Sequence, residues 1–221
     1  KKLGVIFHEF TPVDEIITAN NKVKQLKTMN GLVDIDVVVL AAGAWTNELL
    51  EKMGIHLPTE PLRKEVCLTE PYHHFIDPLI IDMSSGAYVG QTLKGEILGS
   101  IDYPTPPGLI KLETRLEFVV RWAKAIIKRV PILKNARIMR TWAGYYMMSA
   151  DNSHIMGREP EWPEGLYVAY GYSGHGFMMA PLVGELLAEN ILTGKIPELM
   201  KPFLPTRFKE NKLIQEKLVI G

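Results

Sequence analysis

The period of hydrophobic and polar positions changes along the 221-residue chain, and each change predicts a different kind of structure. In the first stretch, short apolar or alternating segments predict four strands, at residues 3–8, 14–19, 22–29 and 36–42. Asn20-Asn21 and Asn30-Gly31 separate the middle segments, and these residues tolerate the positive φ of hairpin turns. The chain therefore begins with hairpin-connected strands that are followed by one apolar strand.

That last segment, residues 36–42, is a continuous apolar run typical of a parallel strand buried on both faces. It ends in Ala41-Ala42-Gly43, and a helix over 46–53 is predicted next. Ligands of open α/β sheets bind at the carboxyl ends of such strands, where small residues let a planar or phosphate-bearing cofactor lie against the backbone. The alternative is a tight strand-to-helix turn that needs glycine for its geometry alone.

From about residue 58 the spacing of the apolar segments becomes that of an antiparallel sheet. The predicted elements are strands at 63–69, 79–82, 87–91, 96–101 and 136–147, and a helix at 112–129 that Pro131 ends. The last third returns to α/β character, with strands at 154–157 and 166–170 and a helix at 177–192. The tail beyond residue 195 is rich in proline and is expected to wrap a surface and not to form a core.

Composition narrows the class of protein. The 25 Lys and Arg residues balance the 25 Asp and Glu residues, so no net basic field favours nucleic acid. No apolar run is long enough for a transmembrane helix. The lone Cys67 excludes an internal disulfide and fits a reducing compartment, so a cytoplasmic protein is expected. The six histidines show no metal-ligand spacing, and no metal site is predicted.

A second glycine-rich turn follows the predicted strand at 166–170. The sequence "GYSGHGFMMAPLVGE" places Gly171, Gly174 and Gly176 directly before an apolar helix. Backbone N–H groups at a helix start are unpaired and carry partial positive charge, which suits an anion or a dipole. His175 lies inside this turn, where a structural donor to neighbouring backbone and a catalytic group are both open interpretations.

Three motifs together resemble the FAD-dependent D-amino-acid oxidase superfamily: "VVVLAAGAWTNELL", "RTWAGYYMMSADNSHIMG" and "GYSGHGFMMAPLVGELLAENILTGK". Within it they look most like sarcosine oxidase β subunits, glycine oxidase and the β subunit of archaeal L-proline dehydrogenase. The resemblance implies an α/β (α+β) fold. In it, residues 1–57 are the later part of a Rossmann-like FAD-binding domain, 58–140 an antiparallel-sheet substrate domain, 141–200 the return to the FAD-binding domain, and 201–221 a C-terminal tail.

The resemblance also implies residues that contact FAD. They are Val13 at the adenine; Ala41, Ala42, Gly43 and Trp45 along the cofactor; and Tyr172, Ser173, Gly174, His175, Gly176, Phe177 and Met178 beside the ribityl chain and flavin ring. Monomeric sarcosine oxidases attach flavin through a cysteine at the place of Gly144, so FAD is expected to be bound non-covalently here.

Other positions depart from the family pattern. The lysine with which monomeric sarcosine oxidases activate oxygen matches Ile97, which favours a dehydrogenase over an oxidase, and Lys94 would need a register shift to replace it. A lysine that helps hold the substrate carboxylate matches Met178. Tyr146 matches a substrate-pocket tyrosine of sarcosine oxidase. We therefore expect Tyr146, with Tyr88 and Gln91 from the sheet, to line the substrate pocket, although an aromatic residue on a strand is more often part of a core.

The family's Gly-x-Gly-x-x-Gly fingerprint for the pyrophosphate does not occur in this sequence. Roughly 140–150 residues are expected to be missing relative to family size, given the usual domain scale. One hypothesis is an FAD-dependent amine or amino-acid dehydrogenase acting on the CH–NH group of proline or sarcosine, with electrons passing to a second subunit or carrier. The other is a flavin-free fragment or interaction subunit, whose open sheet predicts a dimer or a larger complex.

Overall fold

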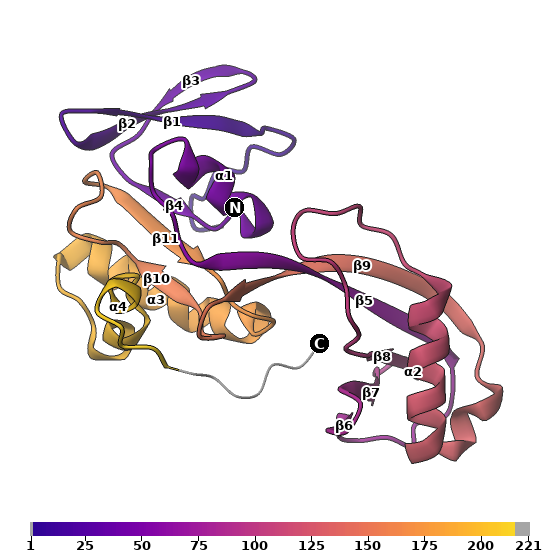
Figure 1. Ribbon diagram of the computed structural model, residues 1–221. Coiled ribbons are helices and arrows are strands. Elements are labelled where there is room, and N and C mark those ends of the chain that lie inside the picture. Colours follow the sequence, from indigo (N-terminus) through magenta and orange to yellow (C-terminus); the bar gives the residue numbers. More distant parts are fainter. Residues whose placement is uncertain (1, 215–221) are drawn as a thin grey trace. The chain divides into compact units, whose positions relative to one another are not determined.

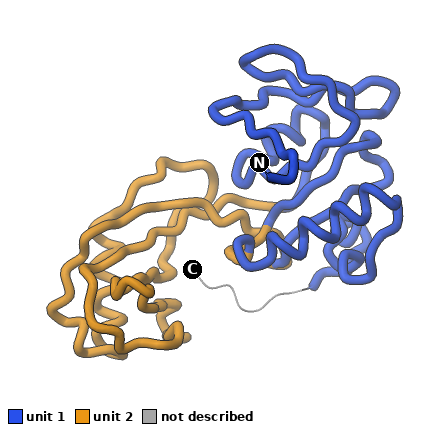
Figure 2. Tube along the Cα trace, turned by 180° about the vertical axis from the view of Figure 1, so that it is seen from behind, with its two compact units in different colours: residues 1–58, 153–171, 176–214 blue, residues 59–152, 172–175, 215–221 orange. Residues whose placement is uncertain are grey.

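The computed structural model describes residues 2–214, which form two compact units (Figure 2). Unit 1 contains the residues up to Pro58, Ser153–Gly171 and Gly176–Ile214, and unit 2 contains Thr59–Asn152 and Tyr172–His175. The first boundary lies one residue from the predicted one. The chain returns to unit 1 at Ser153 and not at residue 141, because strand β9 (Ile138–Ser149) stays paired with β5 (Thr59–Pro71) as far as Ser149.

Unit 1 begins with a three-stranded antiparallel sheet made of β1 (Val13–Ala19), β2 (Lys22–Thr28) and β3 (Gly31–Asp34). Asn20 and Asn21 both have positive φ, 51° and 58°, and connect β1 to β2. The predicted hairpin is therefore confirmed, and the residues that form its turn are those with little steric cost in this conformation.

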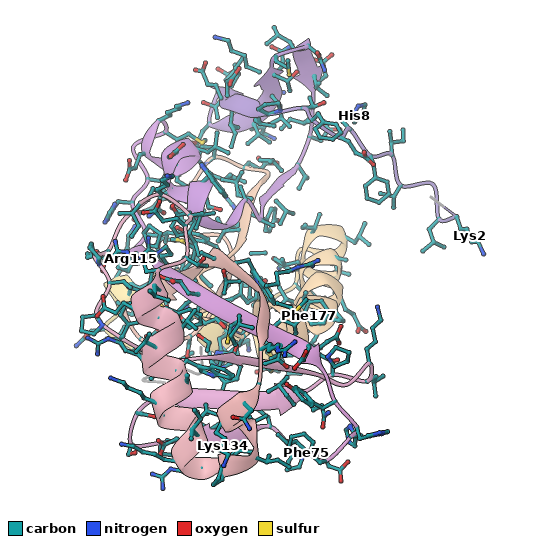
Figure 3. All side chains as sticks on the ribbon, turned by 90° about the vertical axis from the view of Figure 1, so that its right-hand side faces the viewer. Lys2, His8, Phe75, Arg115, Lys134 and Phe177 are labelled. Atoms are coloured by element: carbon teal, nitrogen blue, oxygen red, sulfur yellow. The ribbon has the colours of Figure 1, made fainter. Side chains whose placement is uncertain are left out.

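The predicted strand at residues 3–8 is wrong. This segment runs as an extended chain on which Lys2 and His8 lie (Figure 3), and no described strand pairs with it. Leu3 and Ile6 are 94% and 77% exposed. Its apolar residues suggested a strand, but a strand also requires a hydrogen-bonding neighbour.

The second sheet of unit 1 has the order β10-β11-β4, with β10 at Ile155–Gly157, β11 at Leu166–Tyr170 and β4 at Val38–Leu40. β4 and β11 are parallel, as the apolar run predicted, and β10 is antiparallel to β11. The predicted burial of β4 on both faces is not found among the described residues, because Val39 is 40% exposed. Helix α3 (Gly176–Thr193) contacts β10 and buries Val183, Leu186 and Leu187.

Short helices complete unit 1: η1 (Gly43–Trp45), α1 (Thr46–Glu51), η3 (Glu198–Phe203) and α4 (Thr206–Lys209). Most of residues 198–209 lie on the surface as expected, but the expectation that the tail makes no core contact is wrong there. Met200 is fully buried, and the buried Arg207 donates to the Ser153 carbonyl at 2.8 Å. Phe203 stacks on His154 with ring centroids 4.0 Å apart. Apolar side chains between the prolines therefore give this segment a core contact, whereas residues 215–221 lie outside the described residues.

Unit 2 is a five-stranded antiparallel sheet in the order β6-β7-β8-β5-β9, with β6 at Ile80–Asp82, β7 at Ala87–Gln91 and β8 at Glu96–Ser100. Helix α2 (Leu116–Arg129) lies against this sheet (Figure 1), and the short η2 (Pro131–Asn135) follows it. Phe118, Trp122 and Ile126 of α2 share one core with Cys67 and Ile97 of the sheet. One face of the sheet is therefore covered by α2, and the alternate residues of each strand form the opposite face.

The single cysteine of the chain gives a test of this core. Cys67 is fully buried, donates to the Gly99 carbonyl at 3.5 Å, and burial raises the pKa of its thiol to about 12. Since the thiolate is the reactive form, the native protein should react with iodoacetamide at pH 8 at least about 100-fold more slowly than the urea-unfolded chain. Mass spectrometry of the alkylated protein measures both rates, and equal rates would contradict the buried position.

Candidate functional site

A pocket of about 710 Å³ lies in unit 1 at the carboxyl end of β4. It is lined by Pro12, Val13, Asp14, Leu26, Val38, Val39, Leu40, Ala41, Ala42, Trp45, Glu48, Leu49 and Lys52. Four of the residues expected to contact FAD, namely Val13, Ala41, Ala42 and Trp45, are thus brought together. Val13 is on β1, Trp45 is on η1, and Ala41 and Ala42 lie between β4 and η1. The pocket therefore depends on the packing of β1, β4 and η1 and not on one motif.

The chemistry of this pocket suits part of a dinucleotide. Its volume is in the range of small-molecule sites, and its walls are largely aliphatic with the Trp45 ring beside them. Lys52 donates to the Asp14 carbonyl at 2.6 Å and thereby joins α1 to β1 at the pocket. Gly43 follows directly with a φ of +53°, and a side chain added there would meet nothing within 4 Å. The small residues therefore leave room at the strand end, as a ligand that lies against backbone requires.

The glycine-rich turn folds onto the end of β9. The Ser173 N–H donates to the Met147 carbonyl at 2.9 Å, and the Ser173 hydroxyl accepts from the Ser149 N–H at 3.2 Å. Ser173 is fully buried with a φ of +48°, and its side chain is engaged by β9. The His175 N–H donates to the Tyr172 carbonyl at 2.9 Å. The turn is therefore held by backbone hydrogen bonds within unit 2.

Helix α3 begins at Gly176, directly after this turn. Its first N–H groups have no partner within the helix, because no residue of the same helix precedes them by four. Phe177 lies on the first turn (Figure 3) and is fully exposed, and Met178 is 71% exposed. Burial of Tyr172 raises the pKa of its phenol to about 12, so this hydroxyl stays protonated at neutral pH.

Tyr146, Tyr88 and Gly144 lie on the face of the unit 2 sheet that α2 does not cover. Tyr146 pairs with Leu62 in the register of β9 and β5, and Gly144 pairs with Lys64. Burial raises the pKa of Tyr146, and burial followed by the nearby Tyr146 raises the pKa of Tyr88 to about 12. These two predicted pocket residues are therefore neighbours. A side chain added at Gly144 would meet nothing within 4 Å, so the space beside it is open.

Gln91 does not line this face with Tyr88 and Tyr146, because its side-chain amide is hydrogen-bonded to the backbone of neighbouring loops. Its oxygen accepts from the N–H groups of Phe75 and Ile76, at 2.8 and 3.1 Å. Its nitrogen donates to the His73 and Gly95 carbonyls, both at 3.0 Å. Every polar atom of the side chain serves the backbone of neighbouring loops. We therefore assign Gln91 a structural role in place of the expected pocket-lining role.

The expectation that Ile97 stands at the place of the oxygen-activating lysine, beside the substrate pocket, is also wrong. Ile97 is fully buried in the core with α2, and hence its side chain is on the covered face, away from Tyr88 and Tyr146. One ionic group on the uncovered face is Lys64, which is bonded to Asp102. Neither Lys64 nor Asp102 stands in one of the three motifs, so neither was expected in the site. The two-residue period of a strand could have indicated Lys64, because it places Lys64 on the same face as Leu62, two residues away.

Within residues 2–214, no helix has the length and apolar composition to cross a membrane. Within the same residues, His, Cys, Asp and Glu side chains form no group of three or more placed to hold a metal ion.

Comparison with known proteins bears on this site. The sequence pattern of the DAO family, described as FAD dependent oxidoreductase, matches residues 1–190. The crystal structure of L-proline dehydrogenase from P. horikoshii is similar, with a TM-score of 0.90 and 38% identity over 96% of this chain and 57% of that one.

Two curated relatives are similar over most of this chain. Sarcosine oxidase subunit beta of Rhizobium meliloti is 30% identical, over 97% of this chain and 51% of its own length. Glycine oxidase of Pseudomonas putida is 27% identical, over 88% of this chain and 52% of its own length. The chain spans about half the length of the curated relatives it matches. It belongs to the DAO family of FAD-dependent oxidoreductases.

Proposed function

We propose that the chain is part of a flavin-dependent dehydrogenase that oxidises the C–N bond of an amino acid or secondary amine resembling proline or sarcosine. The observation that carries the proposal is the pocket at the end of β4, where Val13, Ala41, Ala42 and Trp45 meet in a chain of the DAO family. Similar proteins named L-proline dehydrogenase and sarcosine oxidase subunit beta support the substrate class.

FAD would be held non-covalently, because Gly144 offers no side chain for attachment. In unit 1 the pocket residues and Gly43 would contact it, together with Gly176, Phe177 and Met178 at the start of α3. The roles beside FAD that we expect of Gly144, Tyr172, Ser173, Gly174 and His175, which belong to unit 2, stay predictions. FAD, when bound, supplies the acceptor for the substrate hydride. The unpaired N–H groups at the start of α3 would favour negative charge beside them.

A dehydrogenase is favoured over an oxidase by the ion pairing of Lys64 on the uncovered face of unit 2. The Lys64 ammonium there is bonded to the Asp102 carboxylate, so the pair carries no net charge. An ion pair stabilises a superoxide-like charge less than an isolated cation does. Electrons would then leave through a second subunit or a carrier protein. The cytoplasmic location and the dimeric or larger assembly stay predictions.

Absorption spectroscopy tests this proposal. The purified chain, titrated with FAD and then desalted, should retain an absorption band near about 450 nm that a flavoprotein shows. Ala42→Trp should abolish retention, because the indole would fill the pocket at the end of β4. Anaerobic addition of L-proline or sarcosine with an artificial dye acceptor should then give amine-dependent dye reduction. A chain that stays colourless after FAD addition would contradict flavin binding by this polypeptide.

That colourless outcome would favour the second function, a flavin-free interaction subunit. The observation in its support is the apolar surface at β4, where Val37 and Val39 are each 40% exposed. Apolar surface of this kind on a sheet is a common docking site for another chain. Analytical ultracentrifugation of the flavin-free protein distinguishes a monomer from the complex that this function requires.

A further inference from the structure

Four polar side chains gather on the uncovered face of the unit 2 sheet, those of Lys64, Tyr88, Tyr146 and the Lys64 partner Asp102. Lys64 lies three residues before Cys67 in an unbroken stretch of β5, and Cys67 is in the core with α2, so Lys64 is on the opposite face. Tyr88 precedes the core residue Val89 and is likewise on the uncovered face. Tyr146 belongs to this face because it lies two residues from Gly144, the partner of Lys64.

The Lys64 ammonium is held in place on this face. It is bonded to the Asp102 carboxylate, and it lies 5.7 Å from the centroid of the Tyr146 ring. Its side chain is only 12% exposed, although lysine side chains are usually solvated. Restricting a flexible lysine in this way removes much of the entropy that a ligand would otherwise lose in ordering it. Lys64 is therefore a preorganised cation.

Space for a ligand adjoins the pair. Gly144 lies directly opposite Lys64 and leaves its side of the sheet open. The Asp102 side chain is 44% exposed, and Trp142, two residues from Gly144, is 40% exposed. The space at Gly144 and the exposed part of Asp102 thus leave room for a small molecule beside the ion pair.

The charges of Lys64 and Asp102 determine which ligand would fit them. An ammonium and a carboxylate in contact match a ligand that carries a carboxylate and an ammonium close together. The raised pKa values of Tyr88 and Tyr146 keep both phenols protonated, and each can donate or accept a hydrogen bond. A simple amine would satisfy Asp102 and leave Lys64 without a new partner.

We infer that this face binds the polar head of a zwitterionic α-amino acid, with its carboxylate on Lys64 and its amino group on Asp102. The inference rests on the proposed function and narrows it, because it selects amino acids over amines that lack a carboxylate. Lys64 and Asp102 would be substrate-binding residues that set this specificity.

Binding of three ring compounds to the full chain tests the inference by NMR titration. L-proline carries both groups, pyrrolidine lacks the carboxylate, and cyclopentanecarboxylate lacks the amine. Lys64→Met should weaken binding of L-proline and cyclopentanecarboxylate by about 10- to 100-fold, the usual value of a hydrogen bond to a charged group. It should not weaken binding of pyrrolidine, because Asp102 is then released from its ion pair. Asp102→Asn should weaken L-proline and pyrrolidine instead. Lys22→Met, which removes an exposed lysine paired with Glu164 in unit 1, is the matched control.

The ratio of proline to pyrrolidine affinity is independent of any general loss of folded protein. An unchanged ratio in Lys64→Met would overturn the inference and leave the proposed function intact. Failure of the unaltered chain to bind any of the three compounds would also overturn it, while flavin absorption and dye reduction decide the proposed function separately.

Discussion

Replacing Arg63 with methionine is expected to lower the free energy of unfolding by about 3–5 kcal/mol, because it leaves a buried carboxylate without its cation. Arg63 is 2% exposed, and one of its nitrogens lies 3.2 Å from a Glu65 oxygen. Another donates to the Lys111 carbonyl at 3.1 Å. The Glu65 carboxylate also accepts from the Tyr103 hydroxyl and, at 2.8 Å, from the Arg115 N–H. The pair thus fastens the 103–115 segment to β5.

Urea unfolding followed by tryptophan fluorescence measures this change. Lys22→Met removes an exposed ion pair with Glu164 and should stay within about 0.5 kcal/mol of the unaltered protein. The double variant Arg63→Met/Glu65→Gln should recover part of the loss, because a neutral amide is less costly to bury and still accepts a hydrogen bond. A single variant as stable as the Lys22 control would show that the buried pair contributes nothing.

Local patterns predicted the elements that local chemistry determines. Asn20 and Asn21 tolerate left-handed backbone, so they set the position of the first hairpin. The apolar run at 36–42 indicated a parallel strand, and β4 pairs in parallel with β11. The start of α2 shows the limit of this reasoning. Its period indicated residue 112, but Arg115 is extended and gives its N–H to Glu65, so the helix begins at Leu116.

Long-range contacts account for what the sequence did not reveal. Arg63 and Glu65 alternate with half-buried neighbours on β5, a pattern that usually indicates a solvated face, yet the distant 103–115 segment covers them. Lys64 and Asp102 are 38 residues apart and meet only through the register of the sheet. Gln91 looked like a pocket residue because no sequence pattern showed the loop backbone that engages its amide.

The glycine-rich turn contains a position where one methyl group should have a large effect. Gly174 has a φ of +97°, and a side-chain carbon added there would lie 2.6 Å from Cε2 of the Tyr146 ring. Gly174→Ala is therefore expected to destabilise the protein by about 2–4 kcal/mol, combining the cost of left-handed backbone with that of overpacking. The clash is with ring atoms of a half-buried tyrosine on β9, which cannot yield without moving the turn or the ring.

Gly184 supplies the matched control. It lies in the middle of α3, and a side chain added there would meet nothing within 4 Å, so Gly184→Ala should be neutral or stabilising by up to about 1 kcal/mol. Combining Gly174→Ala with Tyr146→Leu separates the two causes, because the smaller side chain relieves the clash and leaves the backbone cost in place. If Gly174→Ala unfolds in urea at the same midpoint as Gly184→Ala, the turn does not rest on Tyr146. The double variant is expected to recover only the part of the lost stability that comes from overpacking. In that case Gly174 is needed for its left-handed backbone and also for the close approach of the turn to Tyr146, which we place in the substrate site.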